Sequence, residues 1–257
     1  MTDSRFALGV LVTLSLGGAG CAGTGNDAPT GTVGDAGYGV FRYACVDEGD
    51  AVCAETAAVD SAVTRPDLGV DGQIPRSIAV SGRFDLSYTG AVPEQGGYSL
   101  PVEIVPARTD VVHTTGAFSF SSPATVAFLA RNPQGITVDF IHVTASTATA
   151  LTLWSAAAPV VGLALAPPGA ETSLGVVPSD ADGISLGGAL GYEWTSSDEA
   201  IVRLSPVGST DTPIAGLLVQ DDEVRVVGMA EGQATVRVAL GSLSQEVAVT
   251  VGAGVTP

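Results

Sequence analysis

The sequence predicts an all-β protein with two β-sandwich units. Gly and Pro are abundant, at 33 and 15 of the 257 residues, a combined share well above the usual ~12%. Charged residues make up only 14%, against roughly 25% in an average globular chain. Apolar residues make up 46% and form short runs that turn residues interrupt roughly every ten positions. A turn-rich chain with enough apolar residues for packed cores is typical of sandwiches rather than of helical bundles.

The first unit is predicted over residues 74–146. Its expected strands are 78–81, 84–88, 100–105, 118–120, 125–130 and 136–143. In the last of these, Ile136 and Phe140 alternate with Asp139, which is the period of a half-buried strand. We therefore expect Phe140 to face the core. His142 continues the same side of the strand, so we expect a partly buried ring with its hydrogen bonds satisfied.

The second unit is predicted over residues 147–253. Its expected strands are 150–154, 160–165, 172–177, 190–194, 201–204, 214–219, 224–227, 234–238 and 246–251. The tripeptide Ala-Thr-Val occurs at 124–126 and again at 234–236, each time in the strand that precedes the last strand of its unit. This internal echo predicts that the two units are related and that each closes with a hairpin.

The first 20 residues have the layout of a secretory signal. Arg5 precedes the apolar run 6–16, and the small residues 17–20 follow it. As a helix, residues 6–20 would be about 22 Å long, which is short of the ~30 Å hydrocarbon core of a bilayer. A membrane-spanning helix is therefore the weaker interpretation.

The end of this segment, Gly18-Ala19-Gly20-Cys21, resembles the lipobox of bacterial lipoproteins, although the family usually has Leu where Gly18 stands. The resemblance implies that Cys21 is lipidated and anchors the mature chain to a membrane. Ala22 after it favours the outer membrane. The alternative is ordinary cleavage near Ala19 or Ala22, which would release a secreted protein. Residues 21–38 are small, polar and Gly-rich, so we expect a flexible linker.

Two further cysteines, Cys45 and Cys53, lie in the segment 39–73. If Cys21 carries lipid, they form an even pair in an oxidising compartment. We expect a structural disulfide that closes a hairpin-like loop around the acidic turn 47–50, worth roughly 2.5 kcal/mol in chain entropy. A redox or metal pair would have the short Cys-x2-Cys spacing, which is absent here.

Residues of about 148–252 resemble a bacterial immunoglobulin-like domain of group 2, the kind found in intimin- and invasin-type surface proteins. The residues that carry the resemblance are Trp194, Ser196, Ser197, Asp198 and Gly232, in the family order Trp-x-Ser-Ser-Asp and then Gly-x-Ala-x-(Ile/Val). The resemblance implies that Trp194 fills the core and that the Ser-Ser-Asp segment forms a side-chain-to-backbone turn. Gly232 would permit a tight entry into the last hairpin. The stretch 205–223 is longer than the family's usual link, and residues 74–146 match much more weakly.

Catalytic and metal-binding patterns are sparse. Residues 183–187 match Gly-x-Ser-x-Gly, but the hydrolase order requires a His after the Ser. Both His113 and His142 precede it, so we interpret 183–187 as a loop between strands. The acidic clusters at 47–50, 180–182 and 221–223 are interpreted as solvated turns, with calcium binding at the ends of the sandwiches as the alternative. No metal or cofactor is expected, and we assign no catalytic residue.

The charge balance excludes nucleic-acid binding. All ten basic residues are dispersed Arg, and the formal net charge is −17, whereas binding to phosphate backbones needs clustered cations. The favoured hypothesis is a secreted, lipid-anchored protein of the bacterial cell envelope with two immunoglobulin-like sandwiches. It would act as a spacer or as an adhesion module for an extracellular protein or glycan. The rival hypothesis is an envelope enzyme or an accessory carbohydrate-binding subunit.

Overall fold

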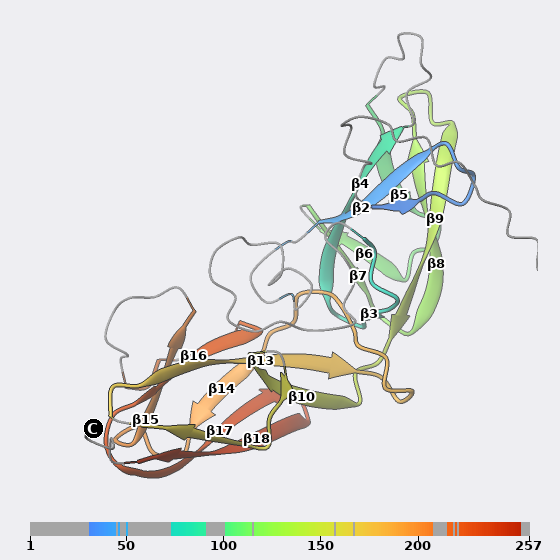
Figure 1. Cartoon of the computed structure of the whole chain (residues 1–257). Coiled ribbons are helices and arrows are strands. Elements are labelled where there is room, and N and C mark those ends of the chain that lie inside the picture. The colour runs from blue at the N-terminus through green and yellow to red at the C-terminus, as the bar shows by residue number, and fades with distance from the viewer. Residues whose placement is uncertain are drawn as a thin grey trace, which may run out of the picture.

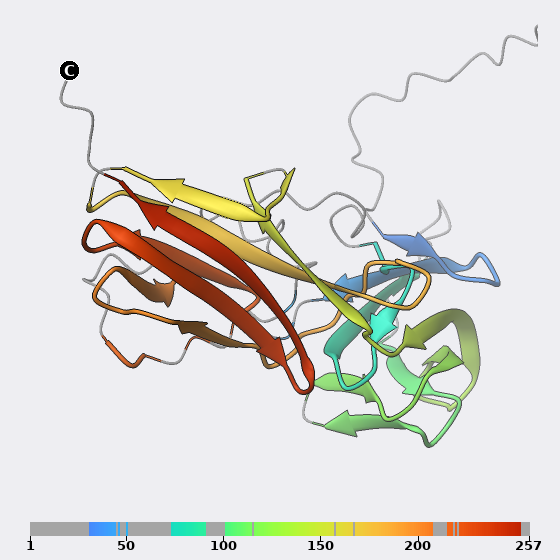
Figure 2. The same cartoon turned by 90° about the horizontal axis from the view of Figure 1, so that it is seen from below.

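The structure is a computed structural model, and it describes residues 31–44, 46, 50, 73–90, 101–114, 116–156, 158–166, 168–207, 215–217, 219 and 221–252. All regular elements in these ranges are strands, which form two sandwiches whose strands run in different directions (Figures 1 and 2). The described part of the chain contains no helix that could cross a membrane.

The first sandwich consists of a five-stranded sheet in the order β1-β2-β4-β7-β6 and a four-stranded sheet in the order β3-β9-β8-β5. The strands of the first sheet are β1 (Thr32–Val33), β2 (Gly39–Ala44), β4 (Arg83–Gly90), β6 (Val111–Thr114) and β7 (Ala117–Phe120). Those of the second sheet are β3 (Ile78–Ala79), β5 (Glu103–Pro106), β8 (Ala124–Arg131) and β9 (Thr137–Ser146). All neighbours are antiparallel except β3 and β9, which run parallel.

The second sandwich repeats this plan, with sheets in the orders β11-β10-β13-β16-β15 and β12-β18-β17-β14. The strands of the first sheet are β10 (Ala150–Ser155), β11 (Ala158–Pro159), β13 (Glu171–Ser179), β15 (Val202–Pro206) and β16 (Glu223–Gly228). Those of the second sheet are β12 (Gly162–Leu165), β14 (Glu193–Ser196), β17 (Gly232–Leu240) and β18 (Leu243–Val251). Here β12 and β18 form the parallel pair.

Both sandwiches have the strand order of the immunoglobulin fold. The sheets β10-β13-β16-β15 and β14-β17-β18 correspond to its ABED and CFG sheets, and β12 is added beside the last strand. In the first sandwich β2-β4-β7-β6 and β5-β8-β9 correspond in the same way, with β3 added. The predicted closing hairpins are β8–β9 and β17–β18. The all-β, two-sandwich fold expected from the sequence is therefore confirmed.

The first sandwich begins earlier in the chain than the sequence predicts. Strand β1 lies in the predicted linker, and β2 lies in the predicted cysteine-containing segment, yet both belong to the sheet of β4. In the sequence, residues 45–77 lie between β2 and β3 of this sandwich. Cys21, Cys45 and Cys53 lie outside the described residues, so the lipid anchor and the disulfide remain predictions.

The orientation predicted for β9 is wrong. Asp139, Ile141 and Val143 face the core, whereas Phe140 is half-buried and His142 is exposed. The pairing of β8 with β9 is irregular near Arg131. Because of this irregularity, the later residues of β9 face the opposite side from the one that strict alternation from Ile136 predicts. Strand β6 was not predicted from the sequence. A strand was predicted over 214–219, but residues 215 and 216 of that range form a turn.

Each sandwich has its own hydrophobic core. The first is aromatic, with Phe84 packed against Phe118, Phe120 and Phe128 at ring-centroid distances of 5.8 to 5.9 Å. The second contains mostly Val and Leu around the single indole of Trp194, which is 1% exposed. Because the core residues fill the inner faces of the sheets, any site must lie on the outer faces, at the edges or in the loops.

Candidate functional site

The Ser-Ser-Asp turn, which we define as Ser196, Ser197 and Asp198, ties two strands of the second sandwich together. The Ser197 hydroxyl accepts a hydrogen bond from the Thr235 backbone N–H at 2.8 Å, and the Ser197 N–H donates to the Thr235 carbonyl at 2.9 Å. The Asp198 carboxylate accepts from the backbone N–H of Ala200 at 2.9 Å. This turn satisfies its own backbone through side chains.

Trp194 connects the core to the long link between β15 and β16. Its indole Nε1 donates to the carbonyl of Asp221 at 2.8 Å, and its backbone N–H donates to the carbonyl of Val219 at 3.2 Å. The link 205–223, which is longer than in the resembling family, is therefore held at this end by the tryptophan. A buried indole needs such a partner for its N–H.

Gly232 lies against the same turn. Its φ is +148°, and a Cβ built there would come within 2.7 Å of Ile201 Cδ1. The N–H of Ile201 donates to the carbonyl of Asp198, so Ile201 is held against the Ser-Ser-Asp turn. The two halves of the motif, separated by more than 30 residues, thus meet in one small region.

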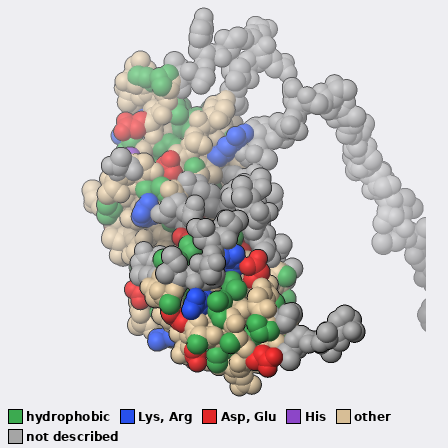
Figure 3. Space-filling view, turned by 90° about the vertical axis from the view of Figure 1, so that its left-hand side faces the viewer, with side chains coloured by type: hydrophobic (Ala, Val, Ile, Leu, Met, Phe, Trp, Pro, Cys, Tyr) green, Lys and Arg blue, Asp and Glu red, His purple; other side chains and the backbone are tan. Residues whose placement is uncertain are grey.

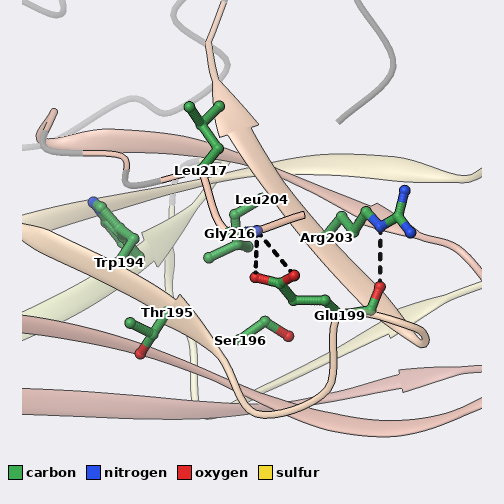
Figure 4. A pocket seen from close by; sticks show the side chains of 8 residues that line it. All are labelled: Trp194, Thr195, Ser196, Glu199, Arg203, Leu204, Gly216 and Leu217. Atoms are coloured by element: carbon green, nitrogen blue, oxygen red, sulfur yellow. Dashed lines mark hydrogen bonds between the residues drawn. The ribbon is translucent and has the colours of Figure 1, made fainter. Parts of the chain in front are cut away.

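A cavity of about 180 Å³ lies beside these residues. Figure 4 shows Trp194 on one side, Leu217 above, and Glu199 with Arg203 on the other side. Both carboxylate oxygens of Glu199 accept a hydrogen bond from the Gly216 N–H at 3.0 Å, while Arg203 Nε donates to the Glu199 carbonyl at 3.2 Å. The Glu199 carboxylate therefore holds the link beside Trp194.

The hydrogen bonds of this cavity that the structure describes are structural ones. Ser196 is the hydroxyl nearest the carboxylate in sequence, yet its oxygen accepts from the Asp198 N–H at 3.4 Å instead of pairing with a base. Among the lining residues that the structure describes, no nucleophile is hydrogen-bonded to a general base, the pairing that covalent catalysis requires.

The two sandwiches meet along a seam, which we define as residues 77–83 of the first and 187–189 of the second. Four backbone hydrogen bonds of 2.7 to 3.0 Å cross it, and they connect Gly187 with Ser77 and Ala79, and Ala189 with Arg83. Gly188 lies at closest approach, where an added Cβ would be 3.1 Å from the Cα of Gly82. The loop that the sequence matched to a hydrolase elbow is thus part of an interface between units.

Apolar contacts extend the seam over the outer face of the second sandwich. Val177 of β13 is 4% exposed and belongs to the core cluster of the first sandwich. Trp154 of β10 is half-buried and packs against the same cluster. Only residues 147–149 link β9 to β10. A three-residue link with backbone pairing and buried side chains on one side holds the two units in a defined orientation.

Asp50 adds a polar contact across this interface. It is fully buried, and its carboxylate accepts from the Tyr43 hydroxyl at 2.5 Å and from the Gly188 N–H at 3.1 Å. Asp50 lies between β2 and β3 in the sequence, and its acidic cluster at 47–50 was predicted to be a solvated turn. That interpretation is wrong for Asp50, because the carboxylate joins the first sandwich to the second.

The acidic cluster at 221–223 also differs from the solvated turn that the sequence predicts. Asp222 is 3% exposed and Glu223 is 5% exposed, so neither forms a solvated turn. Burial of a carboxylate needs compensating partners, which a one-dimensional pattern does not reveal. Among the described residues, no three His, Cys, Asp or Glu side chains lie close enough together to hold a metal ion.

Asp139 is the second buried carboxylate of the first sandwich. It accepts from the backbone N–H of Ala36 at 3.0 Å and of Tyr38 at 2.9 Å, and so holds the turn between β1 and β2. On the outer side of the same strand, His142 pairs with Asp35 of that turn at 2.7 Å. His142 is therefore satisfied, as expected, but its side chain is 55% exposed.

Tyr88 provides a pH-dependent prediction. Burial raises the pKa of its phenol above 10.0, and the charge of Asp139 and a 3.5 Å hydrogen bond to it act in the same direction. Because the folded state favours the neutral phenol, its contribution to stability is complete below pH 10.0 and is lost as the pH rises through the raised pKa. We expect Tyr88→Phe to flatten the alkaline fall in the free energy of unfolding.

Denaturant titrations across this alkaline range would measure that slope. Tyr38→Phe is the matched control, because it removes a hydroxyl from a ring of the neighbouring turn that is 67% exposed. If the free energy of unfolding of Tyr88→Phe falls with pH as steeply as that of the wild type, ionisation of the Tyr88 phenol does not contribute to the alkaline loss of stability.

The surface offers no single dominant chemistry on the face that Figure 3 draws. Acidic, basic and hydrophobic side chains are interspersed among its described residues. This mixture is typical of a solvated protein surface and does not mark a large apolar patch on that face.

Strand order and the buried tryptophan on β14 define the chain as an all-β protein with two immunoglobulin-like sandwiches. No protein-family profile matches the chain, and no curated protein matches it. Solved structures of similar fold include domains 4–9 of the surface-layer protein SbsC, with 18% identity and a TM-score of 0.33 over 75% of this chain and 30% of that one.

Two further similar structures are an integrin-binding protein and an adhesin by their descriptions. Invasin, a bacterial integrin-binding protein, has 17% identity and a TM-score of 0.33, with 70% of this chain and 39% of that chain covered. The adhesin FdeC of Escherichia coli has 15% identity and a TM-score of 0.33, with 70% and 62% covered. This chain thus spans less than two thirds of the length of each of the three.

Proposed function

We propose that this chain is a lipid-anchored protein of the bacterial cell envelope that acts as a rigid spacer and presents a binding surface away from the membrane. The observation that carries the proposal is the seam. Backbone hydrogen bonds join residues 77–83 to residues 187–189, and the buried Asp50 carboxylate crosses the same interface. Two domains joined in this way cannot swing freely, in contrast to the usual flexible junction between domains.

The anchor is supported by the N-terminal pattern. A basic residue, the apolar run 6–16 and small residues precede Cys21, and a Gly-rich segment follows it. A lipidated Cys21 would hold the first sandwich near the membrane, and the seam would fix the direction in which the second one points. The disulfide between Cys45 and Cys53 remains part of this proposal, since it would close the loop that carries Asp50.

Membrane fractionation tests the anchor. We expect the wild-type chain to stay in the membrane fraction through a high-salt wash, because a diacylglyceryl group supplies the two chains that stable anchoring needs. Cys21→Ser should leave an uncleaved precursor or a released soluble form. Cys53→Ser is the matched control, because it replaces a cysteine outside the lipobox and should not change the fractionation. A soluble wild-type protein that begins near Ala22 would overturn the anchor.

A further inference from the structure

A groove lies at the end of the first sandwich that is remote from the seam. It has a volume of about 370 Å³ and is formed by residues 101–103 and 105 at the start of β5, by the last residue of β8 and by the turn that joins β8 to β9. Since β9 leaves this turn and runs toward the link 147–149, the groove is at the opposite end of the sandwich from the second unit (Figure 1).

Arg131 is the unusual residue of this groove. It is the last residue of β8 and lies directly opposite Glu103 of β5. Within the part of the chain that the structure describes, its buried Nε has no hydrogen-bond partner and its side chain makes no ion pair. By comparison, Arg108 pairs with Asp110 at 2.8 Å and Arg225 pairs with Glu171 at 3.2 Å. A guanidinium without an ionic partner can pair with an acceptor that a ligand supplies, and the walls of a groove shield such a pair from water better than open surface does.

The remaining lining residues define the chemistry of such a ligand. The walls are aliphatic and come from Pro101, Val102, Val105 and Pro133. A guanidinium presents paired donors that match the two oxygens of a carboxylate. None of the described lining residues is aromatic, so the groove offers no ring on which a sugar could stack. The Glu103 carboxylate lies opposite the arginine and opposes any anion, so it disfavours a ligand with two negative charges more strongly than a monocarboxylate.

We infer that this groove binds a single carboxylate carried on a compact aliphatic group, with Arg131 as the carboxylate-binding residue. A free aliphatic acid and the C-terminal residue of a peptide share this chemistry. The inference goes beyond the proposed spacer role, because it names a ligand class and a site at the end of the rigid pair that is remote from the seam.

Calorimetric titration of the purified full chain in detergent micelles tests the inference. The probes are N-acetyl-leucine and N-acetyl-leucinamide, which differ only in the carboxylate, together with a leucine-terminated pentapeptide in acid and amide forms. We expect each acid to bind about tenfold more tightly than its amide, the difference that one charge-assisted contact supplies. A pentapeptide acid that binds more tightly than the small acid would identify a chain end as the ligand, whereas equal affinities would identify small acids.

Variants assign the effect to Arg131. Arg131→Gln should remove the preference for the acid, and Arg131→Lys, which keeps the charge but not the paired donors, should retain part of it. Arg108→Gln is the matched control, because it removes an arginine of the same sandwich that already has a partner. If Arg131→Gln does not fold, the Nε–H resonance of Arg131 in the wild-type chain should still shift with the acid and not with the amide.

Three results would overturn the inference: equal affinity for acid and amide, an unchanged preference in Arg131→Gln, or no heat and no shift at millimolar probe. These titrations involve no membrane. A failure of lipid anchoring would therefore leave the groove standing, and a failure of the titrations would leave the anchor standing.

Discussion

Replacing Trp194 with alanine is expected to lower the free energy of unfolding of the second sandwich by about 3–5 kcal/mol, the range for deletion of a large buried aromatic side chain. The indole is 1% exposed, and among the buried residues that the structure describes in this core only Tyr192 carries another aromatic ring. Its loss would also free the carbonyl of Asp221, which accepts from Nε1. The long link between β15 and β16 should therefore loosen together with the core.

Urea titration followed by circular dichroism would measure this loss. Trp154→Ala is the control, because it deletes the same side chain from the half-buried position beside the seam, where we expect a smaller effect on the second sandwich. A Trp194→Ala chain that melts within a few degrees of the wild type would show that the tryptophan does not organise this core.

The second large effect is expected from Gly188→Val. Gly188 has a φ of +100°, and an added Cβ would lie 3.1 Å from both the Cα of Gly82 and the Cγ2 of Ile78. A branched side chain cannot be accommodated there without separating the two backbones, so the hydrogen bonds of the seam should break. We expect both sandwiches to remain folded and to unfold in two separate thermal transitions.

Gly183→Val is a matched control for this variant. Gly183 lies in the same loop and has a φ of +77°, but an added Cβ there would meet no atom within 4 Å. It therefore carries the backbone strain of a left-handed residue without the steric overlap. Small-angle X-ray scattering should show a wider distribution of inter-unit distances for Gly188→Val alone. The same scattering curve for both variants would contradict the seam.

The strands of this fold could be predicted because they depend on local patterns. Turn residues and apolar runs located most of them, and the Ala-Thr-Val echo located both closing hairpins. The orientation of β9 could not be predicted in the same way. An irregularity beside Arg131 moves Asp139 to the inner side, and its buried carboxylate is stabilised by backbone donors from a turn about 100 residues earlier.

The same distinction between short-range and long-range features applies to the candidate site. The Ser-Ser-Asp turn is a short-range feature, and the family resemblance implied its side-chain-to-backbone bonds. The seam is a tertiary feature in which Gly187 and Gly188 contact a segment about 100 residues earlier in the chain. A signal was nevertheless present, since a run of Gly between strands often marks a close approach of two backbones. The sequence interpretation treated that run only as a loop.

The parallel pairing of β12 with β18 has a mechanical consequence. The two strands point the same way, so tension between the ends of the second sandwich pulls them past each other along their length. The register pairs from Gly162 with Ala248 to Leu165 with Val251 then share the load, whereas in a hairpin such as β17–β18 a force across the open end breaks one pair after another. β3 and β9 repeat this geometry in the first sandwich. Stretching a single molecule from its two ends would therefore meet its greatest resistance at these strands.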